Sequence, residues 1–233
     1  TQKYKKKVIQ LGEKPSSVHL VGALGIEGIK KNDYLNRSEL KKKLGITFNR
    51  YNLLTTFHPV TLEHNTSKKQ FKNILNALKK VKNTNIFFTK TNSDTNGRII
   101  NKLIDKFLKN DPKKYYSFKS LGSKNYYSIV SEVDCVLGNS SSGILEVPSF
   151  KIPTINIGDR QLGRIQAKSI FNCKPKTNEI IKLLRSLLLN KKKKKLKNIK
   201  NPYDYGIASD KIISVLKKSK LKNVLKKNFY EII

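Results

Sequence analysis

Residues 138–149 read Gly138-Asn139-Ser140-Ser141-Ser142-Gly143-Ile144-Leu145-Glu146-Val147-Pro148-Ser149 and directly follow an apolar run at 133–137. This order predicts a buried strand, then a turn of small polar residues, then a helix. Backbone N–H groups at such a turn, together with the helix dipole, favour binding of an anion such as phosphate. An ordinary strand-loop-helix connection, in which a serine caps the helix, explains the same spacing.

Glu146 falls within the first turns of the predicted helix and is expected to face the same crevice as the serine turn. A carboxylate beside a phosphate would repel it, so this residue needs another task. In dinucleotide-binding folds an acidic residue accepts hydrogen bonds from ribose hydroxyls. The same task fits Glu146.

Strand-like apolar runs alternate with helical patterns along the chain. Such alternation is the signature of a parallel sheet covered by helices. The expected strands lie at 18–21, 52–57, 85–89, 115–118, 133–137 and 154–157. Apolar residues spaced by three and four mark helices at 71–81, with Ser67 as a cap, at 100–107 and at 180–187. The sequence predicts an α/β fold, a Rossmann-like doubly wound parallel sheet, over about residues 15–200.

Polar loops follow the predicted strands, at the edge where ligands bind in open parallel sheets. His58-Pro59 follows the second strand, residues 91–97 follow the third, and residues 158–164 follow the last. A histidine and an arginine that converge on the serine turn would form a diphosphate pocket. His58 is weighed evenly between a ligand-binding and a structural role, whereas His19 and His64 are interpreted as structural.

The chain of 233 residues carries a formal net charge of +33, which invites a nucleic-acid-binding interpretation. The distribution argues against it, because nearly all of the charge is lysine, is spread through every predicted helix and includes few arginines. The lysine run at 191–195 follows a helix and is interpreted as a solvated loop. Non-specific affinity for polyanions at low salt is still expected.

No apolar run approaches the roughly 20 residues of a membrane span, and no signal-peptide pattern opens the chain, so we expect a cytoplasmic protein without a membrane partner. Cys135 and Cys173 are interpreted as small core residues rather than as a disulfide or a metal pair. Methionine is absent even at position 1, and the chain opens within a predicted helix at 3–11. We therefore expect a fragment whose N-terminal part is missing.

Four motifs in order along the chain carry a family resemblance. They are Thr56-Phe57-His58-Pro59-Val60-Thr61; residues 138–143 with Glu146; Pro153-Thr154-Ile155-Asn156-Ile157-Gly158-Asp159-Arg160-Gln161 with Gly163-Arg164; and Asn201-Pro202-Tyr203 with Gly206. Together they closely resemble the hydrolysing UDP-N-acetylglucosamine 2-epimerase family, which includes the UDP-N,N'-diacetylbacillosamine 2-epimerases, over about residues 3–218. The Asn-Ser-Ser turn is similar to that of the hydrolysing branch, whereas the non-hydrolysing branch has an Asp-Ser-Gly-Gly turn.

The resemblance implies two Rossmann-like domains in the glycosyltransferase-B arrangement, with a UDP-sugar in the cleft between them. This chain is similar to the C-terminal domain. Residues 1–14 would be a remnant of the N-terminal domain or an interdomain helix, 15–200 the UDP-binding domain, and 201–233 helices that cross back towards the missing domain. The apolar face of the last helix would then be exposed, which favours self-association into a homo-oligomer.

The resemblance also implies roles at the UDP site, and it implies no metal and no cofactor. The roles follow from matching motifs, except that Leu121 is placed by counting back from the serine turn. His58 would contact the diphosphate, Asn92 would line the pocket, Leu121 would offer backbone groups to uracil, Ser140 and Ser141 would bind phosphate, Glu146 would hold the ribose, and Arg160 would approach the phosphates.

The implied reaction removes the C2 proton as UDP departs, which leaves a glycal, and then adds water to give the free 2-epimer. The family takes its acid and base carboxylates from the N-terminal domain. We therefore expect this chain to bind UDP weakly and not to turn over, and its catalytic residues are not identified. The whole protein would serve the synthesis of an acidic nonulosonate, such as a sialic acid, or of a related surface polysaccharide.

Two alternatives stay open. A glycosyltransferase of the same fold also uses Ser/Gly turns and a ribose-binding glutamate, although the His-Pro-Val-Thr and Gly-Asp-Arg-Gln loops favour the epimerase. A basic nucleic-acid-binding module would gather arginine and aromatic residues on one face. The chain departs from the family at Asp204-Tyr205-Gly206, where relatives carry a Gly-Asp-Gly or Gly-Asn-Gly turn, and in the tail beyond Leu216.

Overall fold

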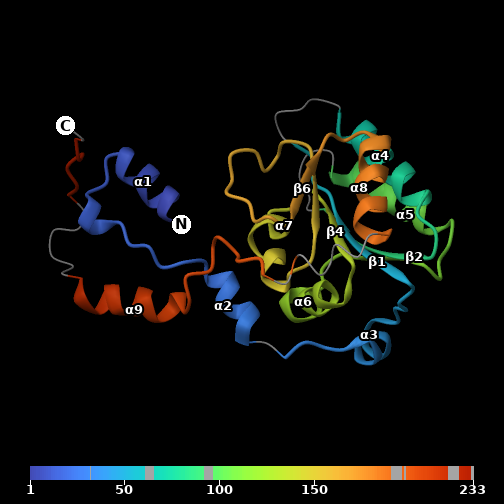
Figure 1. The fold of residues 1–233 in the computed structure, drawn as a ribbon, viewed down its shortest axis with the longest axis horizontal. Helices are drawn as coiled ribbons and strands as arrows, with labels where there is room; N and C mark the ends of the chain where they lie inside the picture. The colour runs from blue at the N-terminus through green and yellow to red at the C-terminus, as the bar shows by residue number, and fades with distance from the viewer. Residues whose placement is uncertain are drawn as a thin grey trace. The chain divides into compact units, whose positions relative to one another are not determined.

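The computed structural model describes residues 1–31, 33–60, 66–91, 97–189, 196, 198–219 and 226–231 (Figure 1). The chain divides into two compact units. One unit is formed by residues 32–201 and contains the sheet, and the other is formed by residues 1–31 together with 202–233. The functional division that the sequence analysis places near residues 14 and 200 stays a prediction.

The larger unit is built on a six-stranded parallel sheet with the order β3-β2-β1-β4-β5-β6. Leu53 in the central strand is in register with Ile86 of β2 on one side and with Cys135 of β4 on the other. The strands are β1 (Tyr51–Thr56), β2 (Thr84–Thr89), β3 (Tyr115–Phe118), β4 (Cys135–Gly138), β5 (Thr154–Ile157) and β6 (Ile170–Cys173).

Helices cover both faces of this sheet and form two hydrophobic cores (Figure 1). The helices α4 (Ser67–Lys79), α5 (Gly97–Leu108) and α8 (Thr177–Leu189) pack on one face. The helices α3 (Arg37–Leu44) and α6 (Gly122–Glu132) and the 3₁₀ turn η2 (Val147–Phe150) pack on the other. The predicted doubly wound α/β fold is therefore confirmed.

The central strands send alternate side chains into the two cores, as the pleat of a strand requires. Leu53 joins the core under α4, whereas its neighbour Leu54 joins the core under α6. Phe88 and Phe87 of β2 divide in the same way. Because both faces are covered, β1 and β2 are buried along nearly their whole length and show no alternation of buried and exposed residues.

The three helices predicted from periodicity form on the residues that the periodicity marks. Phe71, Ile74 and Leu78 lie on the buried face of α4 because residues three and four apart share one side of a helix. Ser67 is the first helical residue and Thr66 is the N-cap, so the predicted cap is displaced by one position.

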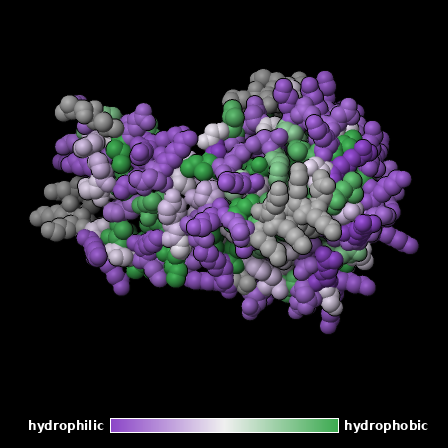
Figure 2. Space-filling view, viewed as in Figure 1, coloured by the Kyte–Doolittle hydropathy of each residue, from purple (hydrophilic) through white to green (hydrophobic). Residues whose placement is uncertain are grey.

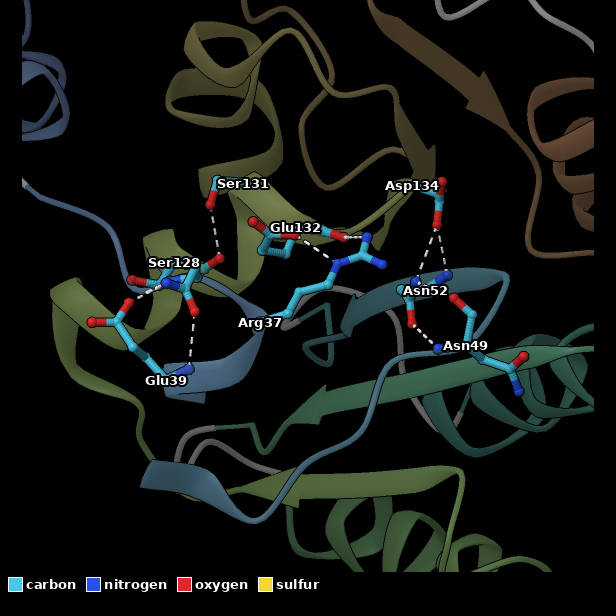
Figure 3. Close-up of polar contacts among 9 residues, drawn as sticks. Arg37, Glu39, Asn49, Asn52, Ser128, Ser131, Glu132 and Asp134 are labelled. Carbon is cyan, nitrogen blue, oxygen red and sulfur yellow. Dashed lines mark hydrogen bonds and ion pairs between the residues drawn. The ribbon is translucent and has the colours of Figure 1, made fainter. Parts of the chain in front are cut away.

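A polar network holds the start of β1 at the amino ends of the strands (Figure 3). The Asp134 carboxylate accepts a hydrogen bond from Asn52 N at 2.8 Å, and the Asn52 side chain accepts one from Asn49 N at 2.9 Å. Nearby, Arg37 Nε donates to Glu132 Oε2 at 2.7 Å, which joins α3 to α6. These contacts set the start of β1 against the segment that leads into β4.

One predicted strand was wrong, and one strand of the sheet was not predicted. Residues 18–21 include the apolar Val18, Leu20 and Val21 but lie outside any strand, because they belong to the smaller unit, where the described residues offer no sheet edge to pair with. The strand β6 was not predicted, because it is a four-residue edge strand with an exposed Asn172 at its centre.

The smaller unit contains α1 (Gln2–Gln10), the 3₁₀ turn η1 (Pro15–Ser17), α2 (Leu24–Lys31) and α9 (Ala208–Lys218). Its two chain segments are joined by Tyr4 OH and Tyr203 OH at 3.1 Å, and by Lys30 Nζ and Asp204 Oδ2 at 2.7 Å. The helix predicted at 3–11 is confirmed as α1.

Cys135 is buried, Cys173 is half-buried, and both are free thiols, as predicted. Within the described ranges, none of the helices has the length and apolar character needed to cross a membrane.

Candidate functional site

The candidate site lies where the winding of the sheet reverses. The strand β1 is flanked by β2 on one side and by β4 on the other, so the chain proceeds outward in both directions from this pair. In open α/β sheets the crevice at the carboxyl ends of such strands binds ligands. His58 follows β1 and the serine turn follows β4, so the topology brings these two sequence-predicted features together.

Gly138 allows the ends of β1 and β4 to approach closely. It has a φ of +138°, and its α-carbon faces Thr56 with no room for a side chain. The next residue, Asn139, donates its backbone N–H to Thr56 O at 3.1 Å. The glycine is thus required both by its backbone conformation and by the close approach of another backbone.

Asn139 joins the serine turn to His58. Its side chain accepts a hydrogen bond from His58 N at 2.7 Å and donates one to His58 O at 2.7 Å. The imidazole Nδ1 of His58 lies 2.9 Å from Thr91 Oγ1, in the loop after β2. Residues from three loops therefore meet at His58.

Arg160 and Gln161 bring the loop after β5 to the same point. Arg160 Nη1 donates to the backbone carbonyl of Asn139 at 3.1 Å, and Gln161 Nε2 donates to the same oxygen at 2.8 Å. This places the predicted arginine beside the serine turn and close to the residue that holds His58. Histidine and arginine side chains can both donate hydrogen bonds to an anion.

The helix after the serine turn is shorter than predicted. The helix α7 (Ser142–Leu145) is a single turn and is followed directly by η2. Ser141 is its N-cap, and Ser141 O accepts hydrogen bonds from Ile144 N at 3.0 Å and Leu145 N at 2.9 Å. The helix-dipole contribution predicted from the sequence is correspondingly small, because few peptide dipoles are aligned.

Glu146 therefore lies just beyond α7, as its C-cap, and not within the first turns of a longer helix. Ser142 Oγ donates to Glu146 Oε2 at 2.5 Å, and Tyr126 OH lies 2.7 Å from Ser142 Oγ. Because the serine hydrogen is committed to the carboxylate, the tyrosine is the donor in the second contact. This chain of hydrogen bonds fixes Glu146 to α6.

Burial is the main cause that raises the pKa values of Tyr126 and Tyr127 well above the ordinary value. The negative charge of Glu146 contributes in the same direction. Both phenols therefore stay protonated at neutral pH and can donate hydrogen bonds.

Two predicted site residues stand apart from this group. Leu121 is a buried residue at the N-cap of α6, and its carbonyl accepts a hydrogen bond from Asn125 Nδ2 at 2.9 Å. It lies on the helix that carries Tyr126, one turn earlier. Asn92 lies outside the described residues, although the preceding Thr91 contacts His58.

Sequence reasoning missed Asn139, Thr91, Tyr126 and Gln161 as parts of the site. Asn139 and Gln161 lie within the motifs at residues 138–143 and 153–161, so the sequence placed them near the site but did not predict their contacts. Thr91 and Tyr126 carry no pattern that would distinguish them from other polar loop or helix residues. Their roles follow only from the contacts that the fold creates.

The sequence model of the UDP-N-acetylglucosamine 2-epimerase family matches residues 1–217. The chain belongs to this family. Over 98% of its length it is 39% identical to the GDP/UDP-N,N'-diacetylbacillosamine 2-epimerase (hydrolyzing) of Campylobacter jejuni, and over its whole length it is 37% identical to the polysialic acid biosynthesis protein P7 of Escherichia coli. The family resemblance seen in the motifs of this 2-epimerase family member is thereby confirmed.

The chain spans 59% of the length of each of these two relatives. Among solved structures, it is similar to the Methanocaldococcus jannaschii UDP-GlcNAc 2-epimerase in complex with UDP-GlcNAc and UDP. The match has a TM-score of 0.67 at 20% identity and covers 94% of this chain and 60% of that one. At this identity the likeness supports the fold of the family member.

Proposed function

We propose that this chain is the UDP-binding part of a hydrolysing UDP-sugar 2-epimerase, acting on UDP-N-acetylglucosamine or a related UDP-2-acetamido sugar. One observation carries the proposal most directly. Asn139 holds His58 through its side chain and receives Arg160 at its carbonyl, so both predicted diphosphate contacts surround the serine turn at the reversal point of the sheet. Family membership gives this anion site its substrate class.

The site residues suit the parts of UDP in an ordered way. His58 and Arg160 would stabilise the negative charge on the departing diphosphate, which grows in the transition state. Ser140 and Ser141 would bind phosphate through backbone and hydroxyl groups. Glu146, held by Ser142, keeps acceptor capacity for ribose hydroxyls because a carboxylate has about four lone-pair sites.

In the proposed reaction of the whole protein, a base removes the C2 proton as the C1–O bond to UDP breaks, and a glycal forms. Water then adds at C1 while a proton returns to C2 from the opposite face, which gives the free 2-epimer. The acid and base would come from carboxylates in the part of the protein that this chain does not include. The chain alone would therefore bind UDP weakly without turning over the sugar nucleotide.

The proposal includes the division of labour predicted from the sequence. Residues 15–200 would bind UDP, with Asn92 lining the pocket and Leu121 offering backbone groups to uracil. Residues 1–14 and 201–233 would serve the part of the protein outside this chain. A cytoplasmic location and self-association of the chain belong to the same proposal.

The whole protein tests the proposed reaction when it is incubated with UDP-N-acetylglucosamine, or with UDP-N,N'-diacetylbacillosamine, in ²H₂O and followed by ¹H NMR. We expect UDP and a free 2-epimer that carries deuterium at C2. In H₂¹⁸O the label should enter at C1. A product that is still linked to UDP, or transfer of the sugar to an acceptor without exchange at C2, would contradict the proposal.

A further inference from the structure

The side chains of Asn139 and Asn101 each form two hydrogen bonds with the backbone of a single loop residue. Asn139 accepts from His58 N and donates to His58 O, at 2.7 Å in each case. Asn101, on α5, accepts from Thr91 N at 3.0 Å and donates to Thr91 O at 3.2 Å. Each amide thus satisfies one N–H and one C=O group of a loop that has just left the sheet.

The two gripped residues contact each other. His58 Nδ1 lies 2.9 Å from Thr91 Oγ1. Asn139 therefore holds the backbone of His58, and Thr91, which Asn101 holds in turn, contacts its ring. Asn139 is only 1% exposed and Thr91 only 6% exposed, so both contacts are shielded from competing water.

We infer that Asn139 and Asn101 are positioning residues that hold the His58 imidazole for the diphosphate of the substrate. This inference rests on the proposed function of the site. An asparagine suits the task because one planar group supplies a donor and an acceptor together, whereas an aspartate would offer acceptors alone. Loss of either asparagine releases the loop that it holds without removing the imidazole.

The carbonyl of Asn139 makes a second contribution that a side-chain substitution leaves in place. Arg160 and Gln161 bond to this backbone oxygen, at 3.1 and 2.8 Å. The variant Asn139→Ala therefore tests the two side-chain hydrogen bonds to His58 separately from the backbone contact with Arg160. Asn73→Ala is a matched control, because Asn73 Nδ2 also links its helix, α4, to a backbone carbonyl of a loop, Pro175 O, at 2.9 Å.

The first test uses the ligand-free chain. The ¹⁵N and ¹H signals of the His58 imidazole, assigned by their loss in His58→Ala, report the tautomer and surroundings of the ring. We expect these signals to shift in Asn139→Ala and in Asn101→Ala and to stay unchanged in Asn73→Ala. Imidazole signals that do not shift in either Asn139→Ala or Asn101→Ala would overturn the inference. Asn101 is half-buried, so its variant keeps the test available if Asn139→Ala fails to fold.

The second test measures the affinities of the folded variants for UDP and for uridine. Asn139→Ala and Asn101→Ala should each weaken UDP binding roughly tenfold, equivalent to about 1.4 kcal/mol, while uridine binding stays within about twofold of the wild type. In the His58→Ala background, Asn139→Ala should have no further effect on UDP affinity. Equal losses for both ligands, or an undiminished loss in that background, would show a general structural role instead. If the wild-type chain binds no UDP, the proposed function fails, and the ring signals still decide whether Asn139 positions His58.

Discussion

The α-carbon of Gly138 lies so close to the carbonyl oxygen of Thr56 that a Cβ atom on Gly138 would be 1.7 Å from that oxygen. We expect Gly138→Ala to lower the free energy of unfolding by at least about 3 kcal/mol, because the strand ends must separate and φ is unfavourable for alanine. Chemical denaturation followed by circular dichroism measures this change.

Gly45→Ala provides the control for backbone strain alone. Gly45 also has a positive φ, +65°, but no described atom beyond its own chain neighbours lies within 4 Å of the position where its Cβ would be. The expected cost is about 1 kcal/mol. If the two variants lowered the free energy of unfolding equally, the close approach of Gly138 to Thr56 would not add to the cost of the substitution.

A second prediction concerns acid stability of the smaller unit. Its buried Glu27 pairs with Lys31 and accepts hydrogen bonds from Ser209 N at 2.8 Å and Ser209 Oγ at 2.7 Å, at the start of α9. These contacts lower the pKa of Glu27 from 4.5 to about 2. A carboxyl group with a lowered pKa stabilises the fold above its ordinary pKa, and this contribution is lost as pH falls towards the folded value.

Hydrogen exchange of α9, corrected for intrinsic rates, measures the effect. Protection of residues 208–218 should be complete above about pH 4.5 and should fall progressively as the pH approaches about 2. In Glu27→Gln, protection should be lower at neutral pH and should change little over the same range. A wild-type profile that is flat between these pH values would contradict the assignment.

A third prediction concerns the tyrosine that holds the Ser142–Glu146 pair. Burial and the nearby Glu146 raise the pKa of Tyr126 above its ordinary value. Phenolate absorbance during a titration to about pH 11 should therefore be the same in the wild type and in Tyr126→Phe, because Tyr126 does not ionise in that range. Wild-type absorbance that exceeds that of the variant by one phenolate would show that Tyr126 is accessible to ionisation.

A fourth prediction separates the charge of the chain from its site. Figure 2 shows hydrophilic side chains spread over the visible face, in line with lysines on α1, α3, α4 and α9. An oligonucleotide should bind at low salt and lose most of its affinity by about 0.2 M salt. Glu146→Ala should not reduce this binding. Affinity that persists at high salt, with a preference for one sequence, would favour a specific nucleic-acid function.

The central strands could be predicted because burial on both faces favours adjacent apolar residues, such as Leu53-Leu54 in β1 and Ile86-Phe87-Phe88 in β2. Among the inner strands, β5 has the predicted bounds and β2 begins one residue earlier than predicted, and the edge strand β3 also has the predicted bounds. Strand character failed as a guide where tertiary context decides. Val18, Leu20 and Val21 are apolar but have no strand to pair with among the described residues, and β6 pairs at the edge of the sheet despite its exposed Asn172.

The site could be predicted in part, because its main residues follow neighbouring strands and topology brings their loops together. His58, the serine turn and Arg160 meet for this reason. Thr91, Asn101 and Tyr126 could not be predicted, because their contacts join loops and helices that only the fold brings together. The short length of α7 was also not predicted. Pro148, in the following 3₁₀ turn, indicates an early helix end, but the sequence prediction did not use it.

The most direct test of the account is calorimetric titration of the chain with UDP at near-physiological salt, for the wild type, Glu146→Ala and Glu132→Ala. Glu132 is the matched control, because its carboxylate pairs with Arg37 at the opposite edge of the sheet. Hydrogen bonds to a charged acceptor contribute about 1.5–3 kcal/mol, so Glu146→Ala should weaken UDP binding roughly 10- to 100-fold and Glu132→Ala should leave it unchanged. UDP binding that Glu146→Ala leaves intact, or no UDP binding by the wild type, would contradict the account.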